Sequence, residues 1–272
     1  MSKAPTKHCQ LDPVPTWLVK QSAEHFAPIL AALCNASFQS GRLPPSEKHA
    51  LVTARLKKPT LDPGDTNSFR PISQLSFVSK LVERAVAVRF TRHCDQNRLL
   101  PARQSAYRCH HSTETAVLIV YNDIVPSVDK GQLVPLVLLD FSSAFDTVDH
   151  DCLLYVLQHR FSVDGDAMTW FRSYLADRTR TFIAGEDRHG PLSVNCSVPQ
   201  GSVLGPIKFI AYTEDVTELI AKHGVNYHMW ADDIRAAVFV MIRSKSVSIC
   251  NHSRARLVDS SRTRTFHGGT QI

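Results

Sequence analysis

Residues 133–150, LVPLVLLDFSSAFDTVDH, are the stretch from which the fold is best predicted. Leu133–Leu139 is a nearly continuous apolar run rich in β-favouring residues, which predicts a strand buried on both faces. Asp140 ends that run and places a carboxylate at the end of the strand. A helix is expected to follow, with Asp146 as its N-cap and Asp149 three residues later, in the manner of a capping box.

A second group of acids lies further along the chain. Val225–Ala231 and Ile234–Val240 are apolar runs separated only by Asp232 and Asp233, which is a hairpin signature with acids at its turn. Together with Asp140, this pair could hold two Mg²⁺ ions, since Mg²⁺ prefers oxygen ligands and needs few protein carboxylates when phosphates complete its shell. Two ions about 4 Å apart suit nucleotidyl transfer. On spacing alone, solvated turn acids remain the alternative.

The remaining elements can be predicted from hydrophobic periodicity and from Gly and Pro positions. Strands and helices interleave without a strict βαβα rhythm, which favours an α+β fold with a split-βαβ sheet. Helices are expected over residues 17–39, 75–96, 113–128, 166–175 and 201–223, a strand over 50–56, and a hairpin over 181–197.

Composition excludes some classes of protein but does not choose a function. The 43% hydrophobic and 21% charged residues describe an ordinary globular chain. The net charge of +6 suggests a nucleic-acid partner. However, residues 241–272 hold six of the 31 basic and one of the 25 acidic residues, so the other 240 residues are nearly neutral. Bulk charge therefore cannot carry the functional argument.

Cysteine usage and hydropathy indicate an intracellular protein. The seven cysteines are scattered and form no C-x-x-C pair, so neither a zinc module nor a disulfide scaffold is indicated. Reduced thiols in the cytoplasm or nucleus are the expectation. Neither a secretory segment nor an apolar run long enough to span a bilayer is found, so we expect no membrane partner.

Several motifs resemble those of reverse transcriptases from non-LTR retrotransposons, in particular the jockey-like elements. LLDFSSAFDTVDH at 138–150 resembles their motif A, VPQGSVLGP at 198–206 their motif B, and WADD at 230–233 their motif C. Upstream stretches also match the family's fingers, and the motifs occur in the family's order from about Asp12 to Asp233. These stretches are FRPIS at 69–73, SKLVE at 79–83, QSAYR at 104–108 and HSTETA at 111–116.

The resemblance implies roles for the acids and their neighbours. Asp140 and Asp232 would bind both Mg²⁺ ions, for which Mn²⁺ could substitute, and Asp233 would support the site or the primer end. The backbone carbonyl of Phe141 would be a further metal ligand. Phe145 would be a steric gate that excludes a ribose 2′-hydroxyl and so selects deoxynucleotides. Plain core packing is the alternative role for Phe145.

The resemblance also implies substrate contacts. Gln200 and Gly201 would line the surface for the incoming nucleotide and the template, where a glycine lets the backbone approach closely. Arg70 would contact the triphosphate, with a fold-stabilising ion pair as its alternative role. Arg108 and Lys58 are weaker candidates for contacts to template or phosphate.

The implied organisation is that of the fingers and palm of a right-hand polymerase. We expect a helical extension over 1–47, fingers over 48–132, a palm over 133–240 and a disordered basic tail over 241–272. The thumb is expected to be missing. Lys208 departs from the family, because it falls in a normally apolar helix and would be costly if buried.

The sequence supports two functions, which belong to different classes of protein. The first is an RNA-directed DNA polymerase that adds dNTPs to a DNA primer on an RNA template. The second is an inactive, truncated retrotransposon remnant that at most binds nucleic acid. No stable protein partner can be inferred from the sequence.

Overall fold

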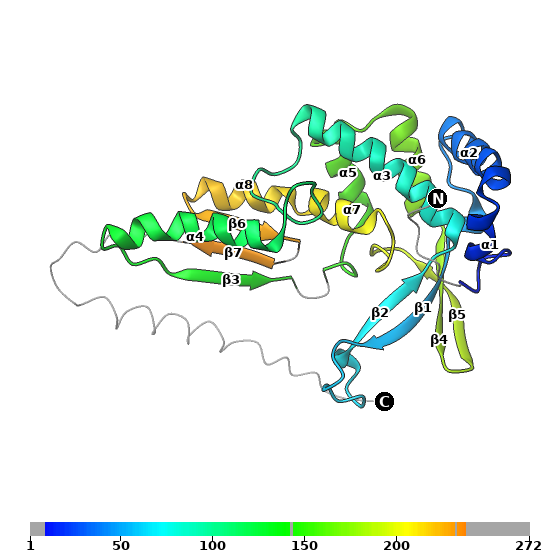
Figure 1. Cartoon of the computed structure of the whole chain (residues 1–272), viewed down its shortest axis with the longest axis horizontal. Helices are drawn as coiled ribbons and strands as arrows, with labels where there is room; N and C mark the ends of the chain where they lie inside the picture. Colours follow the sequence, from blue (N-terminus) through cyan, green and yellow to red (C-terminus); the bar gives the residue numbers. More distant parts are fainter. Residues whose placement is uncertain (1–8, 142–143, 232, 238–272) are drawn as a thin grey trace, which may run out of the picture.

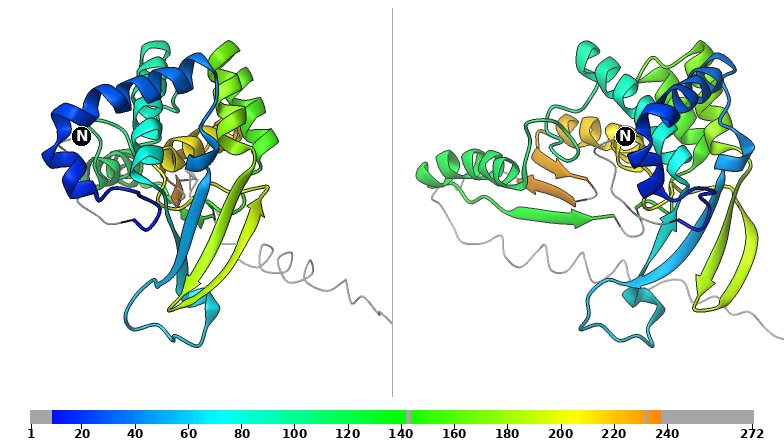
Figure 2. Two further views of the ribbon diagram at one scale, coloured as in Figure 1. Left: turned by 90° about the vertical axis from the view of Figure 1, so that its right-hand side faces the viewer. Right: turned by 45° about the vertical axis from the view of Figure 1, so that its right-hand side comes forward.

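Two β-sheets flank a helical core in the computed structural model, which describes residues 9–141, 144–231 and 233–237. The first sheet has the strand order β2-β1-β4-β5 and extends away from the helices as an arm (Figures 1 and 2). Its strands are β1 (His49–Leu56), β2 (Phe69–Gln74), β4 (Arg178–Ala184) and β5 (Asp187–Val194). β1 pairs antiparallel with β2 and parallel with β4, so segments far apart in sequence share one sheet.

The second sheet contains the segments that carry the acids. Its order is β3 (Leu136–Asp140), β7 (Asp233–Ala237) and β6 (Asn226–Trp230). β7 is antiparallel to both neighbours, so β3 and β6 run parallel with β7 between them. This sheet and the helices confirm the predicted α+β class.

The core lies among the helices between the two sheets. α6 shows why: Met168, Phe171 and Leu175 recur at three- and four-residue intervals on its buried face. The core is rich in aromatic rings, with Phe90 at 5.8 Å from both Phe161 and Phe171 between centroids. The helices are α1 (Thr16–Gln21), α2 (Ala23–Gln39), α3 (Phe77–Asn97), α4 (Thr113–Asp129), α5 (His150–His159), α6 (Gly165–Leu175), α7 (Gly205–Tyr212) and α8 (Glu214–Lys222), with short 3₁₀ turns at Pro45–Glu47 and Thr66–Ser68.

The predicted N-cap of the helix after β3 is wrong. Asp149 caps α5, with its Oδ1 accepting from the backbone N–H of Cys152 at 2.8 Å, whereas Asp146 lies in the preceding turn. The physical reason is that the chain at 148–149 is held extended: Val148 O accepts from Ser197 N at 2.8 Å, and Asp149 bridges to Cys196. The bond from the Cys152 N–H also holds the pKa of the Asp149 carboxyl below its usual range.

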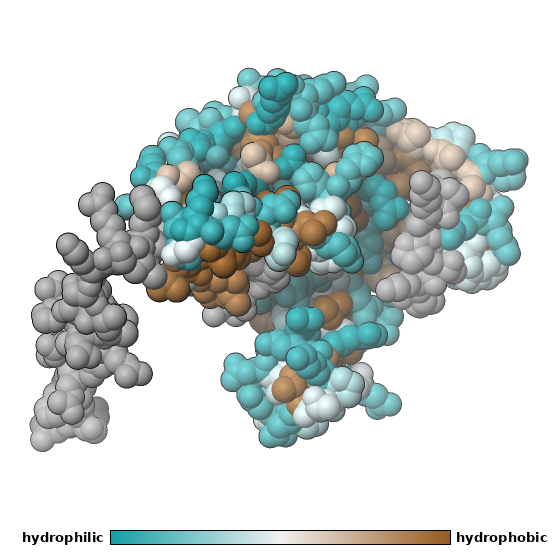
Figure 3. Space-filling model, turned by 60° about the vertical axis from the view of Figure 1, so that its left-hand side comes forward, coloured by the Kyte–Doolittle hydropathy of each residue, from teal (hydrophilic) through white to brown (hydrophobic). Residues whose placement is uncertain are grey.

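The prediction that Leu133–Leu139 forms a strand buried on both faces is also wrong. The four apolar residues of β3 are 42% to 67% exposed. β3 is an edge strand, while α4 and α8 pack against β6 at the other side of the sheet. Figure 3 shows the resulting apolar surface at the end of the molecule built from this sheet and α4. Val117, Leu118 and Tyr121 of α4 are also exposed.

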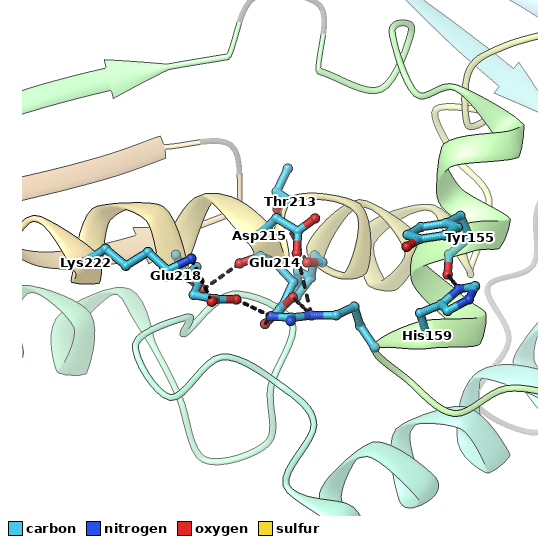
Figure 4. A network of polar contacts seen from close by, with 10 residues as sticks. Tyr155, His159, Thr213, Glu214, Asp215, Glu218 and Lys222 are labelled. Atoms are coloured by element: carbon cyan, nitrogen blue, oxygen red, sulfur yellow. Dashed lines mark hydrogen bonds and ion pairs between the residues drawn. The ribbon is translucent and has the colours of Figure 1, made fainter.

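A network of ion pairs fixes α8 to the end of α5 (Figure 4). Arg160 Nε lies 2.8 Å from Glu214 Oε2, and its NH2 group lies 2.7 Å from Glu218 Oε2. The two carboxylates raise the pKa of the Arg160 guanidinium, and the hydrogen bonds from Lys222 and Arg160 lower the pKa of the Glu218 carboxyl. Glu214 and Asp215 also sit in the first turn of α8, where a negative charge is favourable. Because α8 packs on β6, the network also helps to hold the second sheet in place.

Within the described residues, no helix is long and apolar enough to cross a membrane. The predicted tail at 241–272 lies outside the described residues.

Candidate active site

The strand register brings the acids of the two motifs together. Asp140 at the end of β3 is the register partner of Asp233 at the start of β7, and Asp233 is also the partner of Trp230 on β6. Partners in an antiparallel pair have Cα atoms about 4.5–5.5 Å apart and project side chains from the same face. The side chains of Asp140 and Asp233, and the whole of Asp232, lie outside the described residues.

The turn that carries the acid pair is a tight hairpin. Trp230 and Asp233 close a two-residue loop whose first residue, Ala231, has φ +57°. Two-residue hairpins favour Gly, Asn or Asp at such a position, since other side chains are strained there. Gln104 bonds to this alanine, with its Oε1 3.2 Å from Ala231 N. Gln104 begins the QSAYR stretch at 104–108, and the sequence alone indicates no role for it.

Motif A and motif B are joined by backbone hydrogen bonds. Val198 N donates to Phe145 O at 2.7 Å, next to the bond between Ser197 and Val148. The rings of Phe145 and Phe209 stack with centroids 5.3 Å apart and planes at 28°. Phe141 meets Phe209 edge-on at 6.2 Å. The half-buried Phe145 ring therefore rests on α7, which fixes its position.

The motif B loop also touches the arm sheet. Ser73 N on β2 donates to Gln200 O at 2.7 Å. Gly201 has φ +111°, and a Cβ there would lie 2.6 Å from Ser73 O. The glycine is thus required by a close approach to β2, whereas the predicted reason was a close approach to substrate. Within the described residues, Gln200 Oε1 is buried without a hydrogen-bond partner.

A small cavity lies beside this contact. It has a volume of about 30 Å³, and Asp146, Arg178, Arg180, Ser73 and Gln200 are among the residues that line it. Its size is close to that of one water molecule. Asp146 was predicted as a helix cap; the structure instead places it against the motif B loop.

A buried acid orders the start of α7. Glu83 on α3 is fully buried, and its Oε2 accepts from Val203 N at 2.5 Å while its Oε1 accepts from Tyr174 OH at 2.7 Å. The carboxylate so satisfies backbone donors at a helix N-terminus. The signal in the sequence was available: Glu83 shares the buried face of α3 with Ser79, Val86 and Ala87, at three- and four-residue spacing.

Lys208 faces the core, as its departure from the family suggested it could. It is 1% exposed, and its Nζ lies 4.1 Å from the centre of the Tyr174 ring. Burial lowers the pKa of Lys208 to about 7, partly offset by the charge of Glu83. Among the described residues, its Nζ has no hydrogen-bond partner. A cation–π contact alone compensates poorly for a buried charge.

The arm carries two opposed arginines. Arg55 on β1 is the register partner of Arg70 on β2, and both are exposed. Like charges directly opposite on a sheet destabilise it. Such a pair is suited to an anion between the two guanidinium groups. Lys58 follows β1 in an exposed turn.

Arg108 is engaged within the fold. Its NH1 group donates to Pro101 O at 3.0 Å and to Gln104 O at 3.2 Å. It therefore braces the loop that holds Gln104. A contact of Arg108 to template or phosphate stays a prediction.

No group of three or more His, Cys, Asp or Glu side chains poised for a metal occurs in the described part of the chain, which leaves out Asp232 and the side chains of Asp140 and Asp233. The assignment of Asp140, Asp232, Asp233 and the Phe141 carbonyl as metal ligands stays a prediction.

Comparison with known proteins identifies the family. The profile of the reverse transcriptase (RNA-dependent DNA polymerase) family matches residues 56–259. The chain belongs to this family, as its motifs predicted. The match runs past motif C into the segment expected to be a tail.

Relatives with curated names come from mobile elements. The chain is 33% identical over 187 residues to the probable RNA-directed DNA polymerase from transposon BS of Drosophila melanogaster, covering 69% of this chain and 20% of that protein. It is 29% identical over 210 residues to the RNA-directed DNA polymerase from mobile element jockey of Drosophila funebris, covering 75% and 23%. These relatives confirm the resemblance to non-LTR retrotransposon enzymes. The chain spans less than a quarter of their length.

Among solved structures, apo telomerase from Candida tropicalis truncated from its C-terminal domain aligns with a TM-score of 0.49 and 12% identity, over 80% of this chain and 47% of that chain. Telomerase from Candida albicans in complex with a fragment of telomeric RNA aligns with a TM-score of 0.47 and 13% identity, over 82% and 43%.

Proposed function

We propose that this chain supplies the nucleotidyl-transfer site of an RNA-directed DNA polymerase, which adds dNTPs to the 3′-hydroxyl of a DNA primer on an RNA template. The observation that carries the proposal is the register of Asp140 with Asp233, which joins motifs A and C at one edge of a sheet. Membership of the reverse transcriptase family supports the same reaction.

The residues at this edge fit a hard divalent cation. Asp140, Asp232, Asp233 and the Phe141 carbonyl offer only oxygen donors, the ligands that Mg²⁺ prefers. These four residues would hold two Mg²⁺ ions, with Mn²⁺ as a substitute. When bound, the ions would activate the primer 3′-hydroxyl and neutralise charge on the departing pyrophosphate.

The surrounding residues would bind and select the nucleotide. Phe145 is held by its stack on Phe209 and would close the space for a ribose 2′-hydroxyl. Arg70, with Arg55 opposite, would hold the triphosphate by charge-assisted hydrogen bonds. Gln200 and Gly201 would carry the nucleotide and template surface.

Arg108 and Lys58 are proposed as further contacts to template or phosphate. Lys58 lies in the exposed turn after β1, so its ammonium is accessible to a nucleic acid. One guanidinium nitrogen of Arg108 is already bonded to carbonyls, so its remaining N–H groups would have to make the contact.

The two sheets would then be the fingers and the palm. The sheet of β3, β7 and β6, in which β7 separates two parallel strands, would be a split-βαβ palm within residues 133–240. Residues 48–132 would form the fingers, and β4 and β5 would complete their sheet. Residues 1–47 would be a helical extension. We place the enzyme in the cytoplasm or nucleus, where its nucleic-acid substrates occur.

The competing proposal is a remnant that binds nucleic acid without catalysis. The buried Lys208 and the exposed β3 favour it, because both are costly features for a polymerase core. Primer extension separates the two. We expect a labelled DNA primer on an RNA template to be extended by the 272-residue chain with Mg²⁺ and dNTPs. Binding of the duplex without extension would establish the remnant instead.

A further inference from the structure

Gln104 forms an isolated β-bridge beside β6. Met229 N donates to Arg103 O at 2.9 Å, and Ser105 N donates to Met229 O at 3.1 Å. These bonds make a parallel bridge between Gln104 and Met229. The segment thus lies against the strand that leads into the acid-bearing turn, and Gln104 is 1% exposed there.

The side chain of Gln104 clamps that turn. Its Oε1 accepts from Ala106 N at 2.9 Å and from Ala231 N at 3.2 Å, and its Nε2 lies 3.5 Å from Ala231 O. Both backbone groups of Ala231 therefore face one amide side chain. A non-glycine residue held at positive φ is strained and persists only where its surroundings fix it. Gln104 supplies such fixation at Ala231.

The clamp is itself anchored on two sides. Arg108 NH1 donates to Gln104 O at 3.2 Å. Arg103 is paired with Asp123 of α4 and donates to Tyr227 O of β6 at 3.3 Å. The position of Gln104 is therefore fixed by contacts to α4 and β6, the helix and the strand at one side of the second sheet.

We propose that Gln104 is a positioning residue for catalysis. By holding Ala231 in its left-handed conformation, it fixes the backbone from which Asp232 and Asp233 project, and so their placement relative to Asp140. This inference rests on the proposed function. It assigns to Gln104 no contact with substrate or metal.

Two substitutions separate this role from bulk packing. Gln104→Met keeps the length of the side chain but removes the acceptor for the Ala231 and Ala106 N–H groups. Gln104→Glu keeps an acceptor oxygen for these N–H groups and should therefore behave much like the parent chain. Ser37→Ala is the matched control, because Ser37 is also buried, donates to Arg42 O at 2.6 Å and accepts from Trp170 Nε1 of α6 at 3.0 Å.

The first measurement is amide hydrogen exchange at Ala231, which needs no activity. We expect Gln104→Met to accelerate exchange there at least about tenfold, with Gln104→Glu and Ser37→Ala close to the parent chain. Unchanged exchange in Gln104→Met would overturn the proposal, because the clamp would then not hold the turn.

The second measurement is the metal dependence of primer extension. Loss of a group that orients metal ligands lowers metal affinity or activity by about 10- to 100-fold. We expect Gln104→Met to lower kcat about tenfold and to raise the Mn²⁺ midpoint, followed by electron paramagnetic resonance, by a similar factor, with KM for dNTP nearly unchanged.

The two measurements tell the failures apart. Faster exchange at Ala231 with unchanged kcat and Mn²⁺ midpoint would overturn the positioning role alone. A parent chain that neither extends primers nor binds Mn²⁺ would overturn the proposed function, and the catalytic role of Gln104 with it. An equal loss of kcat in Ser37→Ala would show a general effect of destabilisation and would also overturn the proposal.

Discussion

Asp140 and Asp233 lie directly opposite one another, on neighbouring antiparallel strands, although most of the core-forming helices separate them in the sequence. The insertion of β7 between β3 and β6 creates this relationship, since it brings the residue after the hairpin turn to the end of β3. Each strand offers one carboxylate to the same edge. The functional proposal depends on this pairing more than on any other feature.

Gly201→Ala should damage the contact between the motif B loop and β2. The new Cβ would lie 2.6 Å from Ser73 O and would occupy φ +111°, so the loop must move. We expect a loss of stability of about 1–3 kcal/mol, together with weaker dNTP binding. Thermal unfolding and KM for dNTP measure the two effects. Gly185→Ala is the control, because a Cβ there meets nothing within 4 Å although its φ of +63° is also positive. Equal losses in both variants would leave backbone strain alone as the cause.

Lys208→Met should stabilise the chain, and more so at low pH. The folded-state pKa of Lys208 is about 7, against 10.5 for an unperturbed lysine. Between these values the unfolded chain binds more protons than the folded chain, so stability rises with pH across this window. Below about pH 7 both states are charged and the full cost of burial is present.

We therefore expect Lys208→Met to raise the free energy of unfolding by about 1–4 kcal/mol at pH 6, with a smaller gain at pH 9. Urea unfolding at the two pH values measures it. Lys222→Met is the control, because Lys222 is 65% exposed. A gain that is the same at both pH values would contradict the burial of a charged Lys208.

Phe145→Val should relax selection against ribonucleotides. The ring is positioned by its stack on Phe209, and a smaller side chain would open space beside the bound sugar. We expect the ratio of kcat/KM for dNTP to that for rNTP to fall at least about tenfold. Single-nucleotide incorporation measures the ratio. A ratio equal to that of the parent chain would show that Phe145 serves in core packing and does not select the sugar.

Arg70→Ala and Arg55→Ala should both weaken nucleotide binding without loss of stability. The two guanidinium groups repel one another across β1 and β2, so removing either relieves a like-charge pair. We expect KM for dNTP to rise about tenfold or more while the unfolding midpoint stays the same or increases, since a charge-assisted bond contributes about 1.5–3 kcal/mol. A loss of stability with unchanged KM would instead support the fold-stabilising role of Arg70.

Local sequence patterns predicted most of the helices and strands, but not which of these elements lie next to one another. The hairpin around Asp232 and Asp233 could be predicted because apolar runs and a short polar turn are adjacent in the sequence. The exposure of Leu138 and Leu139 could not, because burial of a strand depends on its place in the sheet. Likewise, β4 pairs with β1 through contacts that no local window contains.

The residues of the candidate site also divide into those that local sequence patterns predict and those that they do not. The acids stood out because they interrupt apolar runs. The role of Gln104 at Ala231 depends on a hydrogen bond across 127 positions, and that of Glu83 at Val203 on one across 120, so neither follows from local pattern alone. The choice between Asp146 and Asp149 as helix cap was also decided at long range, by pairing with Cys196.

The most direct test of the account is single-nucleotide incorporation by Asp140→Asn and Asp233→Asn variants on an RNA template with a DNA primer. Asparagine keeps the shape of each side chain but removes the charge that would hold Mg²⁺. Asp151→Asn is the control, because Asp151 is an exposed acid in the first turn of α5. We expect Asp140→Asn to lower kcat at least about 1000-fold and Asp233→Asn at least about tenfold, with Asp151→Asn unchanged. Incorporation by Asp140→Asn at the rate of the parent chain would show that these opposed carboxylates do not form the catalytic centre.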